Sequence, residues 1–302
     1  MKKILNLGIV LILVLALLAG CAGSKPADQP VEKQEENKET NSTEETKEEA
    51  KYEDGVYFAK ADDFSPNSGW MEVVTIEVKD GKIVTAQWNG AHKDGGIDKR
   101  TASKEGKYQM VEKGGAKAPW YEQAEKVEAY LVDTQDPKAI EYKDDEGHTD
   151  AISGASIKVK GFFSLAEKAL SEGPVSKGPY KDGAYHAEAS EFDAKTGWKE
   201  TVDLTVINGD IIVANWNAVH KDGGADKKTQ SVEGKYQMVE KGGAKASWHE
   251  QAAVAETYLL EKQDPTAIEY KDDQGHTDAI SGVSVAVSSL FKLAEEALVE
   301  AK

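Results

Sequence analysis

Apolar residues open the chain as one continuous run and later recur in short periodic segments, with a polar stretch in between. Residues 4–18 are almost wholly apolar, whereas residues 22–51 are mostly Glu, Lys, Thr, Asn, Ser, Gln and Pro. Beyond residue 52, apolar positions alternate with polar ones or recur at helical spacing. We therefore expect a leader, a tether too polar to form a core of its own, and a folded remainder.

Alternating segments on either side of a tight turn predict a β-hairpin in the first part of the folded region. Residues 69–76 and 83–88 flank Asp80-Gly81. Asp-Gly between β-rich segments favours a two-residue hairpin turn. A further strand should precede the hairpin and contain Tyr57. Strands of this kind, joined by short turns, indicate a mainly antiparallel sheet.

Two later segments have the spacing of amphipathic helices. From about residue 120 to 132, Ala124, Val127, Tyr130 and Leu131 fall on one helical face. A last helix is expected near residues 162–171. Strands and helices without a regular β-α-β alternation indicate the α+β class.

The folded region contains one unit twice. The segment EGKYQMVEKGGAKA stands at residues 105–118 and again at 233–246, and DPKAIEYKDDEGHTDAISGAS, from residue 136, returns as DPTAIEYKDDQGHTDAISGVS from residue 264. A period of this length indicates a duplicated domain. We expect α+β architecture in two tandem copies of a small domain, its mainly antiparallel sheet flanked by helices. Domain 1 should cover residues 52–175 and domain 2 residues 176–302, joined by a segment rich in Gly and Pro.

The beginning of the chain has the layout of an export signal. Lys2 and Lys3 precede the apolar run, and Leu-Ala-Gly-Cys21 follows it. This ending resembles a lipobox, so we expect a lipoprotein signal peptide (residues 1–20), a lipidated Cys21 with an acidic, disordered tether (residues 21–51), and attachment to the outer face of the cell membrane. An ordinary signal peptide that happens to end near a cysteine is the alternative. Cys21 is the only cysteine, which excludes internal disulfides and thiolate metal sites.

The charge balance limits the possible partners. The chain has 37 Lys and Arg against 54 Asp and Glu, a net charge of −17. Phosphate backbones require clustered basic residues, so we expect no nucleic-acid partner. The charge is compatible with attraction to cations or ferric species, or with solubility alone. We expect a monomer. We also expect no metal site, because the acidic segment at residues 143–148 lacks the residue spacing of an EF-hand.

One segment in each copy carries candidate chemistry. It reads HTDAISGAS at residues 148–156 and HTDAISGVS at residues 276–284. It resembles the Asp-x-x-Ser-Gly-Ala-Thr/Ser flavinylation motif of the FMN-binding domain family, in which an ApbE-type flavin transferase moves FMN from FAD onto the last hydroxyl. This sequence departs from the motif in having Ser as the acceptor and Val283 in place of Ala. The resemblance implies two covalent FMN groups, on Ser156 and Ser284, with further cofactor-binding residues Asp150, Asp278, Ser153, Gly154, Ser281, Gly282, His148 and His276.

The residues themselves allow both this interpretation and a simpler one. A phosphate requires a turn of small residues whose backbone N–H groups can face it, and a following helix N-terminus favours an anion. A Ser-Gly turn that only caps a helix is the alternative. Weaker candidates to line a flavin are Trp88, Trp216, His92, His220, Tyr108 and Tyr236, although such aromatic residues more often belong to a core and such histidines to a structural loop.

The resemblance implies an electron carrier with no conventional catalytic residues. The two-copy lipoprotein layout looks like that of extracellular electron-transfer flavoproteins of Gram-positive bacteria. Electrons would come from quinol reduced by a membrane NADH dehydrogenase and pass to ferric iron or soluble flavins. The alternative is a binding or adhesion lipoprotein without a redox role, since duplicated domains on a tether give avidity. Release of a signal-peptide fragment as a pheromone is compatible with either function.

Overall fold

The computed structural model describes residues 51–302. The predicted signal peptide, the predicted lipidation site Cys21 and all of the predicted tether before Lys51 lie outside the described residues. Among the helices of residues 51–302, none combines the length and the apolar character that crossing a bilayer requires.

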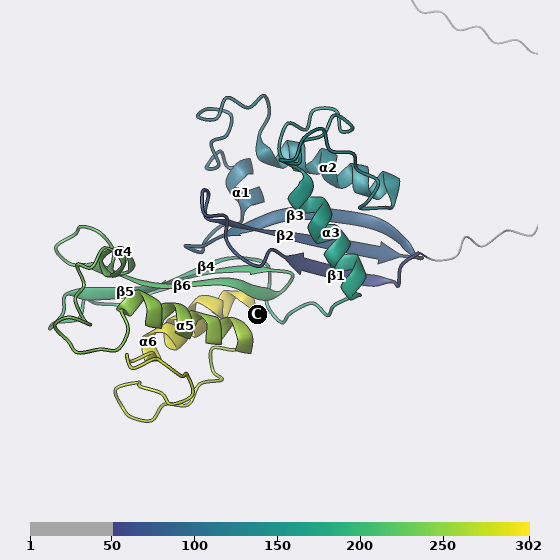
Figure 1. Cartoon of the computed structure of the whole chain (residues 1–302). Helices are drawn as coiled ribbons and strands as arrows, with labels where there is room; N and C mark the ends of the chain where they lie inside the picture. Colours follow the sequence, from purple (N-terminus) through teal and green to yellow (C-terminus); the bar gives the residue numbers. More distant parts are fainter. Residues whose placement is uncertain (1–50) are drawn as a thin grey trace, which may run out of the picture. The chain divides into compact units, whose positions relative to one another are not determined.

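The first repeat consists of three strands and three helices. The strands form an antiparallel sheet in the order β1-β2-β3, and the helices follow them in the chain. Both α2 and α3 pack on this sheet, as Figure 1 shows. The elements are β1 (Gly55–Lys60), β2 (Trp70–Lys79), β3 (Lys82–His92), α1 (Lys99–Lys104), α2 (Trp120–Thr134) and α3 (Lys160–Glu172).

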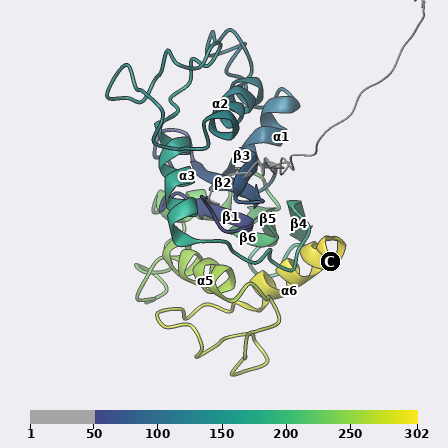
Figure 2. The same ribbon diagram turned by 90° about the vertical axis from the view of Figure 1, so that its right-hand side faces the viewer.

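The second repeat has the same order of elements and ends in a short 3-10 helix. Its sheet is antiparallel with the order β4-β5-β6. In Figure 2 the yellow-green connection between α5 and α6 is long and has no regular element. The elements are β4 (Gly183–Glu188), β5 (Trp198–Ile207), β6 (Asp210–His220), α4 (Lys227–Val232), α5 (Trp248–Lys262), α6 (Ser288–Ala297) and η1 (Leu298–Ala301). The predicted α+β class is therefore confirmed.

The predicted hairpins form where the turn residues stand. Asp80 and Gly81 both have positive φ, 52° and 72°, and Asn208 and Gly209 have 56° and 78°. Two consecutive residues with positive φ define the type I′ turn, whose twist matches that of the flanking strands. The strands run further than the alternation predicted, because β3 continues to His92.

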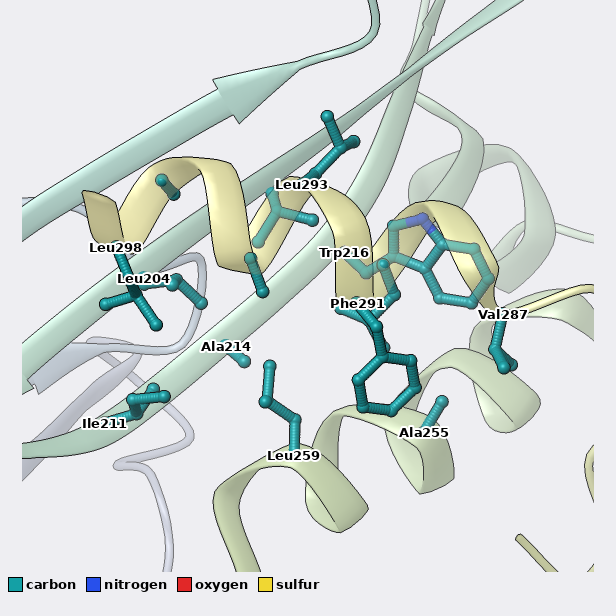
Figure 3. Packing of buried hydrophobic residues seen from close by; sticks show 14 of the residues in the cluster. Leu204, Ile211, Ala214, Trp216, Ala255, Leu259, Val287, Phe291, Leu293 and Leu298 are labelled. Carbon is teal, nitrogen blue, oxygen red and sulfur yellow. The ribbon is translucent and has the colours of Figure 1, made fainter. Parts of the chain in front are cut away.

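The core of each repeat lies between its sheet and its two longer helices. Val202 and Leu204 of β5 and Trp216 of β6 are buried against α5 and α6. Figure 3 shows Phe291 of α6 close to Trp216 and Ala255. Full burial of a side chain such as Phe291 stabilises the fold by about 1.5–3 kcal/mol. The first repeat has the corresponding core, with Val74, Ile76, Trp88, Val127, Leu131 and Phe162 among its members.

Helix α2 also satisfies the backbone of the edge strand β3. Gln135 ends α2 with φ 57°, and its side chain accepts from Ile83 N at 2.8 Å and donates to Ile83 O at 2.8 Å. Glu128 Oε1 accepts from Trp88 N at 2.7 Å. Unpaired groups on an edge strand are a liability for aggregation, and a covering helix removes it.

Two features differ from the sequence-based expectation. The short helices α1 and α4 were not predicted. Their N-caps are Asp98 and Asp226, whose carboxylates accept from Thr101 N and Thr229 N. Helix α3 begins at Lys160 with Val159 as its N-cap. The motif serine, Ser156, lies three residues before this N-cap and is therefore not part of the helix N-terminus.

Candidate functional site

The motif serine of the first repeat lies on the surface and is held by a buried glutamine of α2. Ser156 is exposed, whereas Gln123 is only 1% exposed. Gln123 Oε1 accepts from Ser156 N at 2.7 Å and from Ser156 Oγ at 3.0 Å. Gln123 Nε2 donates to Ala118 O at 2.8 Å, which fixes the amide orientation. The hydroxyl is therefore oriented from within the fold while it stays accessible.

The second repeat has the same arrangement. Gln251 is 1% exposed. Its Oε1 accepts from Ser284 N at 2.7 Å, from Ser284 Oγ at 3.2 Å and from Val285 N at 3.2 Å. Its Nε2 donates to Ala246 O at 2.9 Å. The departure from the motif at Val283 thus leaves the geometry of the serine intact.

The glycines of the motif are required by the backbone. Gly154 has φ 79° and Gly282 has φ 84°, in the left-handed region that residues with a Cβ rarely adopt. The neighbouring Ser153 and Ser281 are exposed. The Ser-Gly pair therefore forms the tight turn that brings the last serine back to the buried glutamine.

The other motif residues form two surface pairs in each copy. Asp150 Oδ1 lies 3.2 Å from Lys143 Nζ, and Asp150 is 81% exposed at its side chain. His148 Nδ1 lies 2.8 Å from Asp144 Oδ2. A hydrogen bond from His148 N and the contact with its ring lower the pKa of Asp144. The second copy repeats both pairs with Lys271, Asp278, His276 and Asp272.

A hollow of about 350 Å³ surrounds the first motif serine. Its lining includes Ser156 and Gln123, together with the basic side chains of Lys117 and Lys143 and the ring of His148. The sequence-predicted residues Asp150 and Gly154 line it as well. We call it the attachment hollow.

A second hollow lies at the start of α6, just beyond Ser284 in the chain. Its volume is about 460 Å³, and Ala286 and Ser289 form part of its wall. Trp198, Tyr236 and Lys227 form another part. We call it the aromatic hollow. The residues of the first repeat that correspond in sequence to Trp198, Tyr236 and Lys227 are Trp70, Tyr108 and Lys99.

The aromatic hollow contains a lysine that the sequence did not single out. Lys227 Nζ lies 4.4 Å from the ring centre of Trp248 and 5.4 Å from that of Tyr236. Its side chain is 9% exposed and its ammonium lies 3.4 Å from Glu200 Oε1. Burial lowers the pKa of Lys227, and the charge of Glu200 opposes this. A buried lysine needs such partners, because a desolvated charge is costly.

The first repeat has the same lysine in place. Lys99 Nζ lies 4.6 Å from the ring centre of Trp120, 5.3 Å from that of Tyr108 and 3.9 Å from Glu72 Oε1. Burial lowers the pKa of Lys99 and raises that of Glu72. Burial also raises the pKa of Tyr108.

The weaker sequence candidates divide between the hollow and the core. Trp88 and Trp216 are each 1% exposed, and both lie in the hydrophobic cores. Tyr236 lines the aromatic hollow. His92 and His220 pack edge-on against Trp70 and Trp198, with ring centres 5.0 Å apart in both pairs.

The site residues that sequence reasoning missed are Gln123, Gln251, Lys99 and Lys227. Each glutamine lies 33 residues before its serine, so no local pattern connects the two. Lysine is among the residues least often buried, so the sequence alone indicates that Lys99 and Lys227 lie on the surface. Their one available signal is that each recurs at the same place in both copies.

Comparison with known families gives a match over the first repeat. Residues 69–171 match the model of the FMN-binding domain. This stretch includes β2, β3, α1, α2 and all of α3 except its last residue, together with the motif at residues 148–156. No curated protein matches the chain.

Solved structures that match are two small clostridial proteins. A solution NMR structure from Clostridium thermocellum shares 66% sequence identity, with 40% of this chain and 91% of that chain covered and a TM-score of 0.33. A crystal structure of a protein from Clostridium perfringens shares 26% identity, with 40% of this chain and 88% of that chain covered and a TM-score of 0.32.

Proposed function

Residues 69–171 form an FMN-binding domain, and we propose that both repeats of this chain hold FMN covalently, on Ser156 and Ser284, and carry electrons outside the cytoplasmic membrane. The observation that carries the proposal is the glutamine–serine pair. In both copies a buried amide oxygen accepts from the backbone N–H and the hydroxyl of the same exposed serine.

The residues around the serine suit a phosphoester. Lys117 and Lys143 line the attachment hollow beside Ser156. Their positive charges favour a phosphate group there. The surface pair Lys143–Asp150 lies at the mouth of the same hollow. We assign Asp150, with Asp278 in the second copy, to recognition by an ApbE-type transferase, because a side chain this exposed is available to a docking enzyme.

The aromatic hollow suits the flavin ring. An apolar ring system with polar edges requires aromatic walls and a few polar groups. In the second repeat Trp198 and Tyr236 supply the walls and Lys227 supplies a cation, next to Ala286 and so close in the chain to Ser284. Bound there, FMN supplies the redox chemistry, taking up and releasing electrons singly or in pairs.

The glutamine orients the acceptor hydroxyl for the attachment step. In that step the Ser156 Oγ–phosphorus bond forms, AMP leaves from FAD, and the hydroxyl proton must go to a base. Gln123 is neutral and already accepts from the hydroxyl, so it positions Oγ and does not take its proton. We assign the base to the transferase.

The setting proposed for this chemistry is the cell surface. The predicted lipid on Cys21 would anchor the chain, and the predicted tether, residues 21–51, would hold the domains at residues 52–175 and 176–302 away from the bilayer. Electrons would enter from membrane quinol, reduced by an NADH dehydrogenase, and leave to ferric iron or soluble flavins. Two flavins in one monomer would allow transfer within the chain.

The test is chemical and site-specific. The chain is produced with an exported flavin transferase, and peptides containing Ser156 and Ser284 are mapped by mass spectrometry. We expect one FMN on each serine, and loss of one FMN in each of the variants Ser156→Ala and Ser284→Ala. Unmodified serines with an active transferase would overturn covalent attachment and favour a binding lipoprotein without a redox role.

A further inference from the structure

Glu200 lines the aromatic hollow of the second repeat, and the equivalent residue of the first repeat is Glu72. One position at which the surroundings of these two glutamates differ is the second residue of the helix that follows the motif serine. The second residue of α3 is Gly161, whereas the equivalent residue of α6 is Ser289. Ser289 Oγ donates a hydrogen bond to Glu200 Oε2. A Cβ on Gly161 would collide with Glu72 Oε2, so the first repeat leaves its glutamate in the space that the serine side chain would need.

In the second repeat three donors hold the glutamate. Besides Ser289, Trp216 Nε1 donates to Glu200 Oε2 at 3.2 Å, and Lys227 Nζ donates to Glu200 Oε1 at 3.4 Å. Two other titratable groups lie near this pair: the charge of Glu200 contributes to a raised pKa of Tyr236, and the charge of Asp193 acts to raise the pKa of Lys227 against the effect of burial. The carboxylate is thus bonded through both of its oxygens.

In the first repeat the glutamate is held more loosely. Within residues 51–302 the Glu72 carboxylate has one ionic partner, Lys99 at 3.9 Å. The indole nitrogen of Trp88, which corresponds to the donor Trp216, is buried and has no hydrogen-bond partner in the described part of the chain. The groups that face Glu72 are Lys99 of α1, Tyr108 of the following loop and Gly161 of α3.

Two properties make Glu72 suited to gain and lose a proton. Its side chain is 31% exposed, so solvent can deliver the proton. Burial raises its pKa, and the charge of Lys99 opposes the rise without cancelling it. A carboxyl group with few donors and a partly dry environment is easily neutralised when negative charge appears nearby.

We propose that Glu72 takes up a proton when electrons enter the site of the first repeat, and that the second site, in which Ser289, Trp216 and Lys227 donate to Glu200, lacks this uptake, so that the two sites couple electron transfer to protons differently. This inference rests on the proposed function. The electrons come from the quinol donor, and the additional proton passes from solvent to a Glu72 oxygen. For each electron pair, the first site then takes up one more proton than the second.

The test compares chains with a single flavin. Ser284→Ala leaves the first site and Ser156→Ala leaves the second, and the reduction potential of each is measured by potentiometric titration across a range of pH. We expect the Ser284→Ala chain to show a pH dependence steeper by one proton per electron pair. Parallel pH dependence in the two chains would overturn the proposal.

Exchanging the distinguishing residue provides the matched control. Gly161→Ser in the Ser284→Ala chain should remove the additional proton, and Ser289→Gly in the Ser156→Ala chain should introduce it. Glu72→Gln should also remove it, and this variant decides the matter if Gly161→Ser does not fold. Unchanged pH dependence after Glu72→Gln would contradict the role of Glu72.

A second readout does not require flavin. In the unmodified protein, the chemical shift of the Glu72 carboxyl carbon is followed by NMR as the pH is varied. We expect Gly161→Ser to move the midpoint of this titration to lower pH. If mass spectrometry finds no FMN but the midpoint moves, the proposed function fails while Glu72 remains a protonatable group. A midpoint unmoved by Gly161→Ser would show that the serine does not control this carboxyl group.

Discussion

The amide oxygen of Gln123 accepts hydrogen bonds from both the backbone N–H and the hydroxyl of Ser156, at 2.7 and 3.0 Å. This pair joins a buried helix position to an exposed loop residue that lies 33 residues later in the chain. The same relationship between Gln251 and Ser284 makes it a property of the repeated unit.

Replacing the glutamine should impair modification of its own serine alone. In Gln123→Ala we expect the FMN content at Ser156 to fall several-fold, because the hydroxyl loses its orienting acceptor, while Ser284 is unaffected. Loss of the buried hydrogen bonds should also cost about 1–3 kcal/mol. Quantitative peptide mapping measures the occupancy, and the exposed Gln109→Ala serves as the control. Equal loss at both serines would indicate general unfolding instead.

The helix end that braces β3 should contribute measurably to stability. Gln135→Ala removes the two hydrogen bonds to Ile83 and leaves an alanine at φ 57°. Gln135→Gly removes the same bonds but suits the left-handed backbone. We expect both variants to be less stable in urea titrations, by about 1–3 kcal/mol for the glycine variant and by about 1 kcal/mol more for the alanine variant. Equal stability of the two variants would show that the backbone conformation is not strained.

The two buried tryptophans should respond unequally to the same substitution. Trp216 Nε1 donates to Glu200, whereas Trp88 Nε1 is without a partner within residues 51–302. Trp→Phe leaves a similar cavity in both cores but breaks a hydrogen bond to a charged group only at Trp216. We expect Trp216→Phe to cost about 1.5–3 kcal/mol more than Trp88→Phe. Hydrogen exchange of the amides of β5 and β2 reports each repeat separately, and equal costs would contradict the assignment.

The cap of α4 should make stability depend on pH. Burial acts to raise the pKa of Asp226, but hydrogen bonds from Thr229 and Asn217 outweigh it and lower the pKa. A lowered pKa in the folded state means that the stabilisation is present above the ordinary pKa of aspartate and is lost as the pH falls through the folded value. Asp226→Ala should therefore cost about 1 kcal/mol at neutral pH and progressively less in acid.

The isosteric variant controls for the cap geometry. Asp226→Asn keeps an oxygen acceptor for Thr229 N but does not titrate, so its stability relative to Asp226→Ala should not vary with pH. Urea titrations at several pH values measure both. A constant cost of Asp226→Ala throughout acid would contradict the origin assigned to the cap.

Local patterns predicted the elements whose causes are local. The hairpin at Asp80-Gly81 followed from two residues that tolerate positive φ. The capping box of α5 has an equally local cause, since Ser247 and Glu250 lie three residues apart and Glu250 accepts from Ser247 N at 2.8 Å. The repeated segments then predicted the architecture, because the elements expected in one repeat are expected in the other as well.

The remainder depends on contacts between distant segments. The short helix α1 has no apolar periodicity over its six residues, KRTASK, and it is stabilised by its packing on α2 and β3. Burial of Lys99 depends on Trp120 and Glu72, which lie on other elements. The sequence placed the motif serine but could not reveal the glutamine that orients it. The domain boundaries, the lipid anchor and the redox partners stay predictions.

Covalent attachment of flavin is tested by the mass of the mature chain isolated with its transferase, combined with mapping of the two motif peptides. We expect two FMN additions, one on Ser156 and one on Ser284. A chain of unmodified mass, with both serines free while the transferase modifies another substrate in the same cells, would contradict it.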